Sequence, residues 1–512
     1  MSTVLVTVSK RSRAKSQMVL MRRMLRVSML GLIVIDLASC GGNGEQTSGP
    51  ESPVTSVTVS PGELALGVGE SKQLTAVARD QAGSPLEGKI IAWATAEPTI
   101  ASVSGAGVAT GTGAGSVTIT ATSEGVSGGA SVSVVSGTFA SVATGGAHTC
   151  ALTASGAAYC WGRGESGQLG VPVPTTTCMT DAGSFPCLKT PGQVGGGLAF
   201  VQLAAGGAHT CGLTNDGSAY CWGSNRNGQL GDNSTATRNA PTLVATELKF
   251  ASIDAGTQHT CALTREGTAY CWGSNGRGQI GDGTTNTRFA PVAVTGGHTF
   301  RVIAAGGFTV GHTCAVTTSG NAYCWGDNER GQLGTGTGGF GDEDLTSHPI
   351  PAPVSTELTF TAVTAGLGRH TCGFTDTGDA YCWGENTFGA LGNESTEDSS
   401  VPASVSGLYD FVQLVAGGFI GHTCGITAED TGFAYCWGEN ETGQVGDGST
   451  FDRLRPSAVA GGLTFTRLDA GFRHTCGSTS SGLYCWGSGG AGQLGTNSTD
   501  RSAVPKKVLG QP

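Results

Sequence analysis

The chain has 512 residues, a formal net charge of −10 and 86 glycines, which is about one residue in six. This glycine content exceeds the usual share of roughly 7%, yet no G-X-Y period accompanies it, so a collagen-like triple helix is excluded. Aromatic and β-branched residues recur throughout, which excludes a wholly disordered chain. We therefore expect a turn-rich, all-β chain of several domains or repeats.

Residues 1–40 have the pattern of a secretory signal. Seven Lys/Arg residues precede a short apolar run, MLGLIVI, which ends in LASC at Cys40. The run is too short for a stable transmembrane helix. LASC resembles the lipobox of bacterial lipoproteins, which predicts a lipidated Cys40; the alternative is an ordinary signal with a chance cysteine. Met21 offers a second start in front of a more typical signal.

Removal of this segment takes away seven positive charges and one negative charge, so residues 41–512 carry a net charge of −16. An acidic, exported chain is a poor partner for phosphate backbones, which select Lys/Arg surfaces. We expect no nucleic-acid partner, and membrane contact through the lipid anchor only. The expected location is the bacterial cell envelope, outside the cytoplasm, on the outer membrane or cell surface.

A linker and a small β-domain follow the signal. Residues 41–52 lack apolar periodicity and predict a flexible linker. Residues 53–136 hold short alternating segments separated by turn residues, which is typical of a β-sandwich. The order V-x-V-x-P, L-x-V-G-x-S-x-Q-L-T-A, Trp93, GVATG and VTITATS resembles the group 2 bacterial Ig-like domains. The resemblance implies a spacer without chemistry, with Trp93 in the core.

Residues 139–512 contain seven repeats. Each repeat reads F-x-x-V/L/I-x-A-G, then HTC, a hairpin turn, YCWG, GQLG and finally P-x-x-V. A unit of about four short strands is the size of one propeller blade, and blades must stack to bury both faces. The first unit has no P-x-x-V before it, and the PKKV at Pro505 has no unit after it. We therefore expect the C-terminal strand to complete the first blade and close a seven-bladed ring.

The pattern AG-x-x-HTC-A-L-T-x-x-G-x-x-YCWG-x-N-x-x-GQLG resembles the regulator of chromosome condensation repeat family over about 370 residues. The resemblance implies a seven-bladed β-propeller, but it is weak for function because this fold hosts many activities. Light-sensing members place tryptophans before the repeat histidine, and that function is not carried over. The equivalent positions here are Ala147, Ala208, Gln258, Gly311, Arg369, Gly421 and Arg473.

Seventeen cysteines divide into Cys40, fourteen in the HTC and YCWG motifs, and two in an insertion. In a hairpin that turns at Ser155–Gly156, Cys150 faces Cys160, His148 faces Gly162 and Trp161 faces Thr149. Facing cysteines in an exported protein predict disulfides. The predicted pairs are Cys150 with Cys160, Cys211 with Cys221, Cys261 with Cys271, Cys314 with Cys324, Cys372 with Cys382, Cys424 with Cys436, Cys476 with Cys485 and, in the insertion, Cys178 with Cys187.

Each His-x-Cys with its facing cysteine is also a candidate zinc site. No fourth ligand recurs, so we expect structural histidines that hydrogen-bond to backbone, with no metal and no cofactor. Acidic residues at Asp232, Asp282 and Asp447 are followed by an arginine, and we expect a loop-stabilising Asp–Arg contact or plain solvation there, with calcium as the alternative. HExxH and a complete Walker loop are absent from the sequence, so a non-catalytic protein is expected.

Two insertions, both between a GQLG and the next P-x-x-V, distinguish the first and fourth repeats. Because they occupy equivalent positions, they should emerge on one side of the disc and form a binding face; the alternative is tolerated surface loops. The candidate ligand contacts are Met179, Phe185, Phe340, Asp342, Glu343 and Asp344.

The sequence as a whole predicts an all-β, monomeric, lipid-anchored scaffold that binds an unknown protein or glycan. The alternatives are an extracytoplasmic hydrolase or lyase with its site in the insertions, or an inhibitor of a secreted enzyme.

Overall fold

The computed structural model describes residues 52–68, 71–135, 139–180, 183–307, 310–339, 344–418, 420–428 and 432–511. The signal segment, Cys40 and nearly all of the linker lie outside these residues, and their assignments stay predictions. Every regular element in the described part is a β-strand. It therefore contains no helix with the length and hydrophobicity of a transmembrane segment.

Nine strands form the N-terminal part. They are β1 (Ser56–Ser60), β2 (Glu63–Gly67), β3 (Ser71–Gln73), β4 (Thr75–Arg79), β5 (Ala92–Thr95), β6 (Ala101–Val103), β7 (Val108–Gly111), β8 (Gly115–Ser123) and β9 (Val126–Val135). The sheets are β1-β4, β2-β9-β8-β5 and β3-β7-β6. Alternate residues of these strands share one apolar core around Leu66, Ile119 and Val132. Trp93 is only half-buried and packs against this core rather than filling it.

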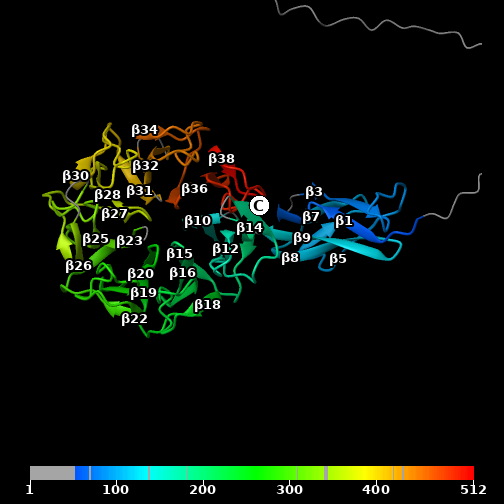
Figure 1. Cartoon of the computed structure of the whole chain (residues 1–512), viewed down its shortest axis with the longest axis horizontal. Coiled ribbons are helices and arrows are strands. Elements are labelled where there is room, and N and C mark those ends of the chain that lie inside the picture. Colours follow the sequence, from blue (N-terminus) through cyan, green and yellow to red (C-terminus); the bar gives the residue numbers. More distant parts are fainter. Residues whose placement is uncertain are drawn as a thin grey trace, which may run out of the picture. The chain divides into compact units, whose positions relative to one another are not determined.

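Four-stranded sheets then repeat from residue 139 to 507, and we number them one to seven in chain order (Figure 1). The first three are β10 (Phe139–Thr144), β11 (His148–Thr153), β12 (Ala158–Arg163), β14 (Gly183–Gln193) and the added β13 (Thr177–Thr180); β15 (Phe200–Ala205), β16 (His209–Thr214), β17 (Ala219–Gly223) and β18 (Arg238–Leu243); and β19 (Phe250–Ala255), β20 (His259–Thr264), β21 (Ala269–Gly273) and β22 (Arg288–Ala293). The fourth is β23 (Phe300–Gly306), β24 (His312–Thr317), β25 (Ala322–Asn328) and β26 (Asp344–Pro353).

The remaining three sheets follow the same order. They are β27 (Ala362–Ala365), β28 (His370–Phe374), β29 (Ala380–Gly384) and β30 (Ser399–Ser404); β31 (Phe411–Gly417), β32 (His422–Thr427), β33 (Ala434–Gly438) and β34 (Arg453–Ala458); and β35 (Arg467–Ala470), β36 (His474–Thr479), β37 (Gly482–Gly487) and β38 (Ser502–Lys507). Repeated four-stranded sheets of this kind are the architecture of a β-propeller.

Each sheet buries its faces against its neighbours. An apolar core lies between every pair of consecutive sheets, and a further core joins the seventh sheet to the first. In that last core, Phe139 and Trp161 of the first sheet pack with Leu483, Leu494 and Val508 of the seventh. The sheets therefore surround a common centre, as Figure 1 shows, and no sheet face of the ring is left without a partner among the described strands.

The expected exchange of the C-terminal strand is wrong. β38, which contains Pro505, pairs with β37 in the seventh sheet, and the first sheet obtains its outer strand from its own repeat, β14. The register explains the error: every P-x-x-V follows its own YCWG and turns back to pair with it. The ring closes by packing of sheet faces and not by strand pairing between the ends of the chain.

Candidate functional site

The HTC and YCWG strands form the centre of every repeat sheet. In the first sheet His148 pairs with Gly162, Thr149 with Trp161 and Cys150 with Cys160, which is the register predicted from the sequence. The same register recurs in the other six sheets, so each HTC cysteine faces the cysteine of its own YCWG.

All eight predicted disulfides are formed with the predicted partners. They join Cys150 to Cys160, Cys178 to Cys187, Cys211 to Cys221, Cys261 to Cys271, Cys314 to Cys324, Cys372 to Cys382, Cys424 to Cys436 and Cys476 to Cys485. The seven in the repeats are fully buried, so these cysteines serve as crosslinks within each hairpin.

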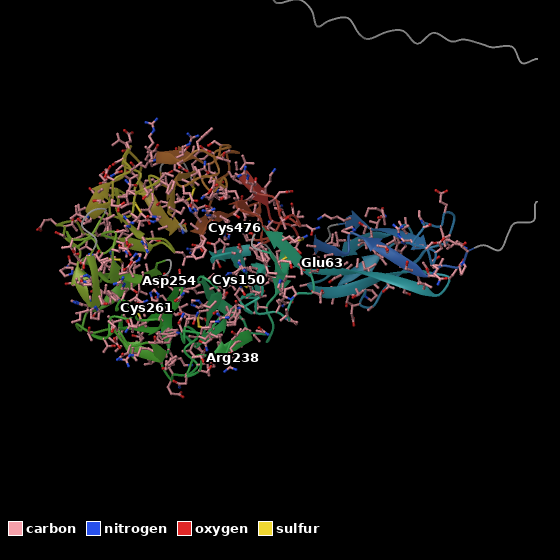
Figure 2. The ribbon with its side chains drawn as sticks, viewed as in Figure 1. Glu63, Cys150, Arg238, Asp254, Cys261 and Cys476 are labelled. Atoms are coloured by element: carbon pink, nitrogen blue, oxygen red, sulfur yellow. A yellow bond between two sulfur atoms is a disulfide. The ribbon has the colours of Figure 1, made fainter. Side chains whose placement is uncertain are left out.

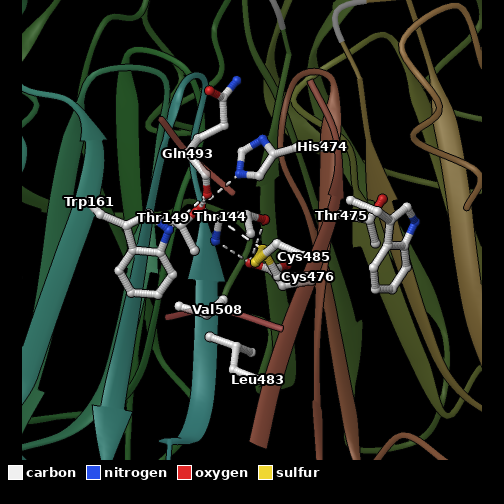
Figure 3. Close-up of a disulfide and its surroundings, with 12 residues drawn as sticks. Thr144, Thr149, Trp161, His474, Thr475, Cys476, Leu483, Cys485, Gln493 and Val508 are labelled. Atoms are coloured by element: carbon white, nitrogen blue, oxygen red, sulfur yellow. Dashed lines mark hydrogen bonds between the residues drawn. A yellow bond between two sulfur atoms is a disulfide. The ribbon is translucent and has the colours of Figure 1, made fainter. Parts of the chain in front are cut away.

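The repeat histidines connect neighbouring sheets. The Nε2 atom of each lies 2.9–3.0 Å from the Oγ1 atom of the HTC threonine in the next sheet. The series is cyclic, because His474 of the seventh sheet contacts Thr149 of the first (Figure 3). The partner is a threonine hydroxyl, so the expected hydrogen bond to backbone is corrected.

The same threonines define the histidine tautomer. Each HTC threonine donates its single hydroxyl proton to a backbone carbonyl; Thr149, for example, donates to the carbonyl of Gln493 at 2.9 Å (Figure 3). The hydroxyl must therefore accept a hydrogen bond from the histidine Nε2–H. The Nδ1 atoms then carry no proton, and none has a hydrogen-bond partner in the described part of the chain. Trp161 Nε1 donates to the same Gln493 carbonyl at 2.8 Å.

The environment keeps these histidines neutral. All seven are buried, and burial lowers their pKa to about 3 in four repeats and about 4 in three. The Nδ1 edge of His148 lies against Gly145, directly after the inner strand β10, where a Cβ atom would overlap the ring. A buried imidazole that is locked by threonine and glycine is a structural element and is unsuited to proton transfer.

The zinc interpretation requires thiolates, and the repeat cysteines are all in disulfides. Among the residues described, no group of three or more His, Cys, Asp or Glu side chains is placed to hold a metal ion.

The Asp–Arg contacts are formed in the outer loops. Arg238 Nε donates to Asp232 Oδ2 at 2.8 Å, and Asp232 Oδ1 accepts from Asn225 and Ser234. Burial alone would raise the pKa of Asp232, but these hydrogen bonds outweigh it and hold the pKa below its usual range. Asp282–Arg288 and Asp447–Arg453 repeat the contact. Both carboxylate oxygens are therefore occupied by donors, which leaves no free oxygen for calcium.

A central cavity of about 450 Å³ is lined by the inner strands of all seven repeat sheets. Two carboxyls, Asp254 and Asp469, face it from the third and seventh sheets, and Asp254 lies toward the centre of the ring in Figure 2. Each accepts a hydrogen bond from the next sheet: Asp254 from the Ala305 amide at 2.8 Å and Asp469 from the Thr144 amide at 2.6 Å. Burial raises the pKa of Asp254 to about 6.

These two carboxyls do not stand out among the sequence motifs. Their only signal is an aspartate at the fifth position of F-x-x-V-x-A-G, where the other repeats hold Ala, Thr or Val. Because the side chains bind to the backbone of the neighbouring sheet, their first role is to join sheets.

Both insertions extend the outer strand of their sheet in the same direction. Arg163 pairs with Cys187 in the first sheet and Asn328 with Asp344 in the fourth, beyond the glycine that faces the histidine. The insertions therefore emerge at the histidine end of the sheets, together with the loops that follow YCWG. We call this end of the ring the insertion face, and the opposite end, with the HTC–YCWG turns, the hairpin face.

The predicted ligand contacts differ in their exposure and in whether they lie among the described residues. Met179 is 77% exposed at the β13–β14 hairpin, so it remains a candidate ligand contact. Phe185 is only 6% exposed; it packs with the Cys178–Cys187 disulfide, and Arg163 lies over its ring at 4.5 Å, so its assignment as a ligand contact is wrong. Phe340, Asp342 and Glu343 lie outside the described residues.

Asp344 stabilises its own loop. Its Oδ2 accepts from Asn328 at 3.3 Å and contacts His348 Nε2 at 2.8 Å, and its Oδ1 accepts from Thr346. Asn225 and Arg238 hold Asp232 in the same way in the second sheet, so Asp344 and His348 replace an Asp–Arg contact. Asp344, a candidate ligand contact, therefore has a structural role in its own loop.

The insertion face also carries charged pairs between sheets that no sequence motif reveals. Arg277 lies 3.6 Å from Asp327, Arg369 lies 3.2 Å from Glu329, and Arg473 lies 3.2 Å from Glu439. These residues occupy variable positions close to the invariant glycines and histidines of the repeats. Only the register of neighbouring sheets shows which of them meet.

Comparison with known proteins agrees with this architecture. A family model described as RCC1-like domain matches residues 36–368 and 190–511. The ultraviolet-B receptor UVR8 of Arabidopsis thaliana is 32% identical over 346 residues, which are 66% of this chain and 62% of the receptor. The human E3 ubiquitin-protein ligase HERC2 is 29% identical over 345 residues, which are 66% of this chain and 6% of the ligase. The match thus covers less than two thirds of either relative.

Solved structures show the same fold. Human WBSCR16 superposes with a TM-score of 0.58 at 21% identity, over 67% of this chain and 88% of that protein. Yeast RCC1 (Prp20), solved bound to Kap60, superposes with a TM-score of 0.55 at 22% identity, over 65% of this chain and 78% of that chain. Because the family model covers well over half of the sequence, the chain belongs to the RCC1-like domain family.

Proposed function

We propose that this protein is a non-catalytic binding module whose insertion face recognises another protein. The complete ring has seven blades in this proposal, and residues 53–136 form an Ig-like spacer. Relatives and structural neighbours support a binding role, since the structure of yeast RCC1 (Prp20) contains bound Kap60. RCC1-like domains recur in proteins of different activity, so the recognition surface must come from residues that are particular to this chain.

One observation carries the proposal: the repeats differ much more in loop length on the insertion face than on the hairpin face. From the YCWG tryptophan to the P-x-x-V proline the distance is 19 residues in five repeats, but 30 in the first and 28 in the fourth. On the hairpin face, the valine directly after each outer strand lies six residues before the next phenylalanine in all six connections, and the two hairpin cysteines are 9 to 12 residues apart in every repeat. Variation concentrated on one face of a repeat protein marks its binding face.

We expect a photo-cross-linking amino acid at position 179 to capture the partner on intact cells, because Met179 is exposed on the insertion face. The same amino acid at position 408 is the matched control, since Leu408 is fully exposed but lies in a hairpin-face loop. A discrete adduct at position 179 and none at position 408 supports the proposal. Adducts at position 408 alone, or at neither position, contradict it.

The export and lipid anchor belong to the same proposal and rest on residues 1–40. The variant Cys40→Ser is expected to leave the membrane fraction or to stay unprocessed, because it lacks the sulfur that accepts the lipid. Membrane association of a processed Cys40→Ser protein would contradict the anchor.

A further inference from the structure

The fourth, fifth and sixth repeats share a feature on the insertion face that the other repeats lack. The residue directly after YCWG is acidic, at Asp327, Glu385 and Glu439, whereas it is arginine or serine elsewhere. Asp327 and Glu439 are buried, with 0% and 2% of their side chains exposed. Burial of a carboxylate is costly unless cations and hydrogen-bond donors compensate for the lost water.

Two of these three carboxyls face an arginine from the preceding repeat. Arg277 lies 3.6 Å from Asp327, and Arg277 and Arg369 both favour the charged form of Asp327. Arg369 and Arg330 favour the charged form of Glu385. Arg277 and Arg330 occupy the same repeat position, two residues before the glutamine of GQLG. In the fifth repeat that position holds Phe388, so Glu439 of the sixth repeat receives no such arginine.

Glu439 is correspondingly short of positive charge. Arg473 is its ion-pair partner in the described part of the chain, at 3.2 Å, and neither carboxylate oxygen accepts a hydrogen bond of good geometry there. Burial raises the pKa of Glu439 to about 7; Arg473 and Gln444 oppose this, and the neighbouring carboxylates of Glu441 and Asp452 add to it.

The surface beside Glu439 is open and carries both charge and an aromatic ring. Glu441 is 72% exposed, and Asp452 is exposed and accepts a hydrogen bond from the Asn440 amide at 2.8 Å. Phe451 is 75% exposed at the same loop, where the second, third and fifth repeats hold Ala236, Asn286 and Glu397. Packing therefore does not require this phenylalanine.

Two arginines accompany these three carboxylates. Arg473 also lies 3.6 Å from Glu441, and Arg501 donates to the Glu441 backbone carbonyl at 3.0 Å. The cluster therefore keeps an uncompensated negative charge beside an exposed aromatic ring.

We propose that the Glu439 site, formed by Glu439, Glu441, Phe451 and Asp452, binds a basic side chain of the partner protein. The inference rests on the proposed function and adds the chemistry of the partner. Arginine is the preferred guest, because a guanidinium forms paired hydrogen bonds with carboxylates and stacks on an aromatic face. The guest supplies the cation that Arg277 and Arg330 supply to the two preceding sites.

Calorimetric titration of the full chain with a capped Gly-Arg-Gly-Arg-Gly peptide tests the site. The arginine peptide should bind at low salt and weaken in about 0.3 M salt, and the same peptide with neutral citrulline should not bind. Glu441→Gln combined with Asp452→Asn should weaken binding about tenfold, the effect of roughly 1.4 kcal/mol. Since a bound cation favours ionised Glu439, binding near neutral pH should release protons, and Glu439→Gln should abolish this release.

Glu329→Gln is the matched control, because Glu329 occupies the equivalent of Glu441 in the fourth repeat, where Arg277 and Arg369 supply cations. It should leave peptide binding within about twofold of the parent value. Equal binding of the citrulline peptide, no binding of the arginine peptide, or an equal loss in Glu329→Gln would overturn the inference. The cross-linking result at position 179 does not depend on this peptide, so the two proposals fail separately.

Discussion

Acidification to about pH 5 is expected to unfold the repeat sheets cooperatively. The seven repeat histidines have pKa values of about 3 or 4 in the folded chain, below the usual 6.5, so unfolding takes up protons. The stability they contribute is fully present above pH 6.5 and is lost as the pH falls toward the folded values. At pH 5 the protonation of each histidine in the unfolded chain lowers the free energy of unfolding by about 2 kcal/mol.

Seven such groups together are comparable to the 5–15 kcal/mol or so that stabilises a typical domain. Carboxyls with a raised pKa, such as Asp254, Glu439 and Asp469, act in the opposite direction, because their protonation favours the folded state. They offset part of the loss. Denaturant titrations between pH 8 and pH 5 should show the midpoint falling steeply below pH 6.5. A midpoint that is constant or rises over this range would show that the histidines do not link folding to protonation in this way.

Loss of the hairpin disulfides is expected to have the second large effect. Each closes a loop of about ten residues, and such a crosslink contributes about 2–3 kcal/mol by restricting the unfolded chain. Reductant alone should leave the native protein unchanged, because the sulfur atoms are buried. Reductant with denaturant should prevent refolding after the denaturant is removed, until an oxidant is added. Far-ultraviolet circular dichroism and thiol titration measure the two steps.

The Cys178–Cys187 disulfide is an internal control for this prediction. It lies in the first insertion and joins β13 to β14, outside the seven hairpins. Its loop is of similar length, but Cys211 and Cys221 also pack in the core between the second and third sheets, whereas Cys178 and Cys187 pack in the small cluster of the insertion. Cys178→Ala combined with Cys187→Ala should therefore lower the melting temperature less than the pair Cys211→Ala and Cys221→Ala. Refolding of the fully reduced chain to the native spectrum would contradict the role assigned to the hairpin crosslinks.

Features that depend on a single hairpin could be predicted from the sequence. The facing of Cys150 and Cys160, of His148 and Gly162 and of Trp161 and Thr149 follows from one turn and the two-residue period of a strand, and the structure confirms it. The Asp232–Arg238 contact is similarly local, since the two residues lie within one loop. Local spacing is sufficient for both.

Features that depend on two sheets could not be predicted in the same way. The histidine partner is a threonine about fifty residues away, and its identity follows only from the stacking of neighbouring sheets. The predicted strand exchange at the ends of the ring is wrong because counting P-x-x-V segments does not say with which YCWG each one pairs. Phe185 has the sequence context of a surface residue, because the packing of the insertion on its own disulfide is not visible in the sequence.

The environment of Glu439 could not be predicted from the sequence either, because it depends on two adjacent repeats. Glu439 is recognisable in the sequence as an acidic residue after YCWG, but its burial and its lack of an arginine neighbour from the preceding repeat are properties of two adjacent repeats. Phe388 acquires its meaning only by comparison with Arg277 and Arg330 at the same repeat position. Residues common to all repeats hold the ring together, and recognition is left to residues that differ between repeats.

The protonation of the seven repeat histidines tests this division most directly. If these side chains only connect sheets, nitrogen NMR of histidine-labelled, folded protein should show seven neutral rings protonated at Nε2, with no change between pH 8 and about pH 6. Substitution of the HTC threonine Thr210→Val should perturb the signal of His148 above all others, because Thr210 is its hydrogen-bond partner. Repeat histidines that titrate near 6.5 in the folded protein, or that carry the proton on Nδ1, would contradict the account.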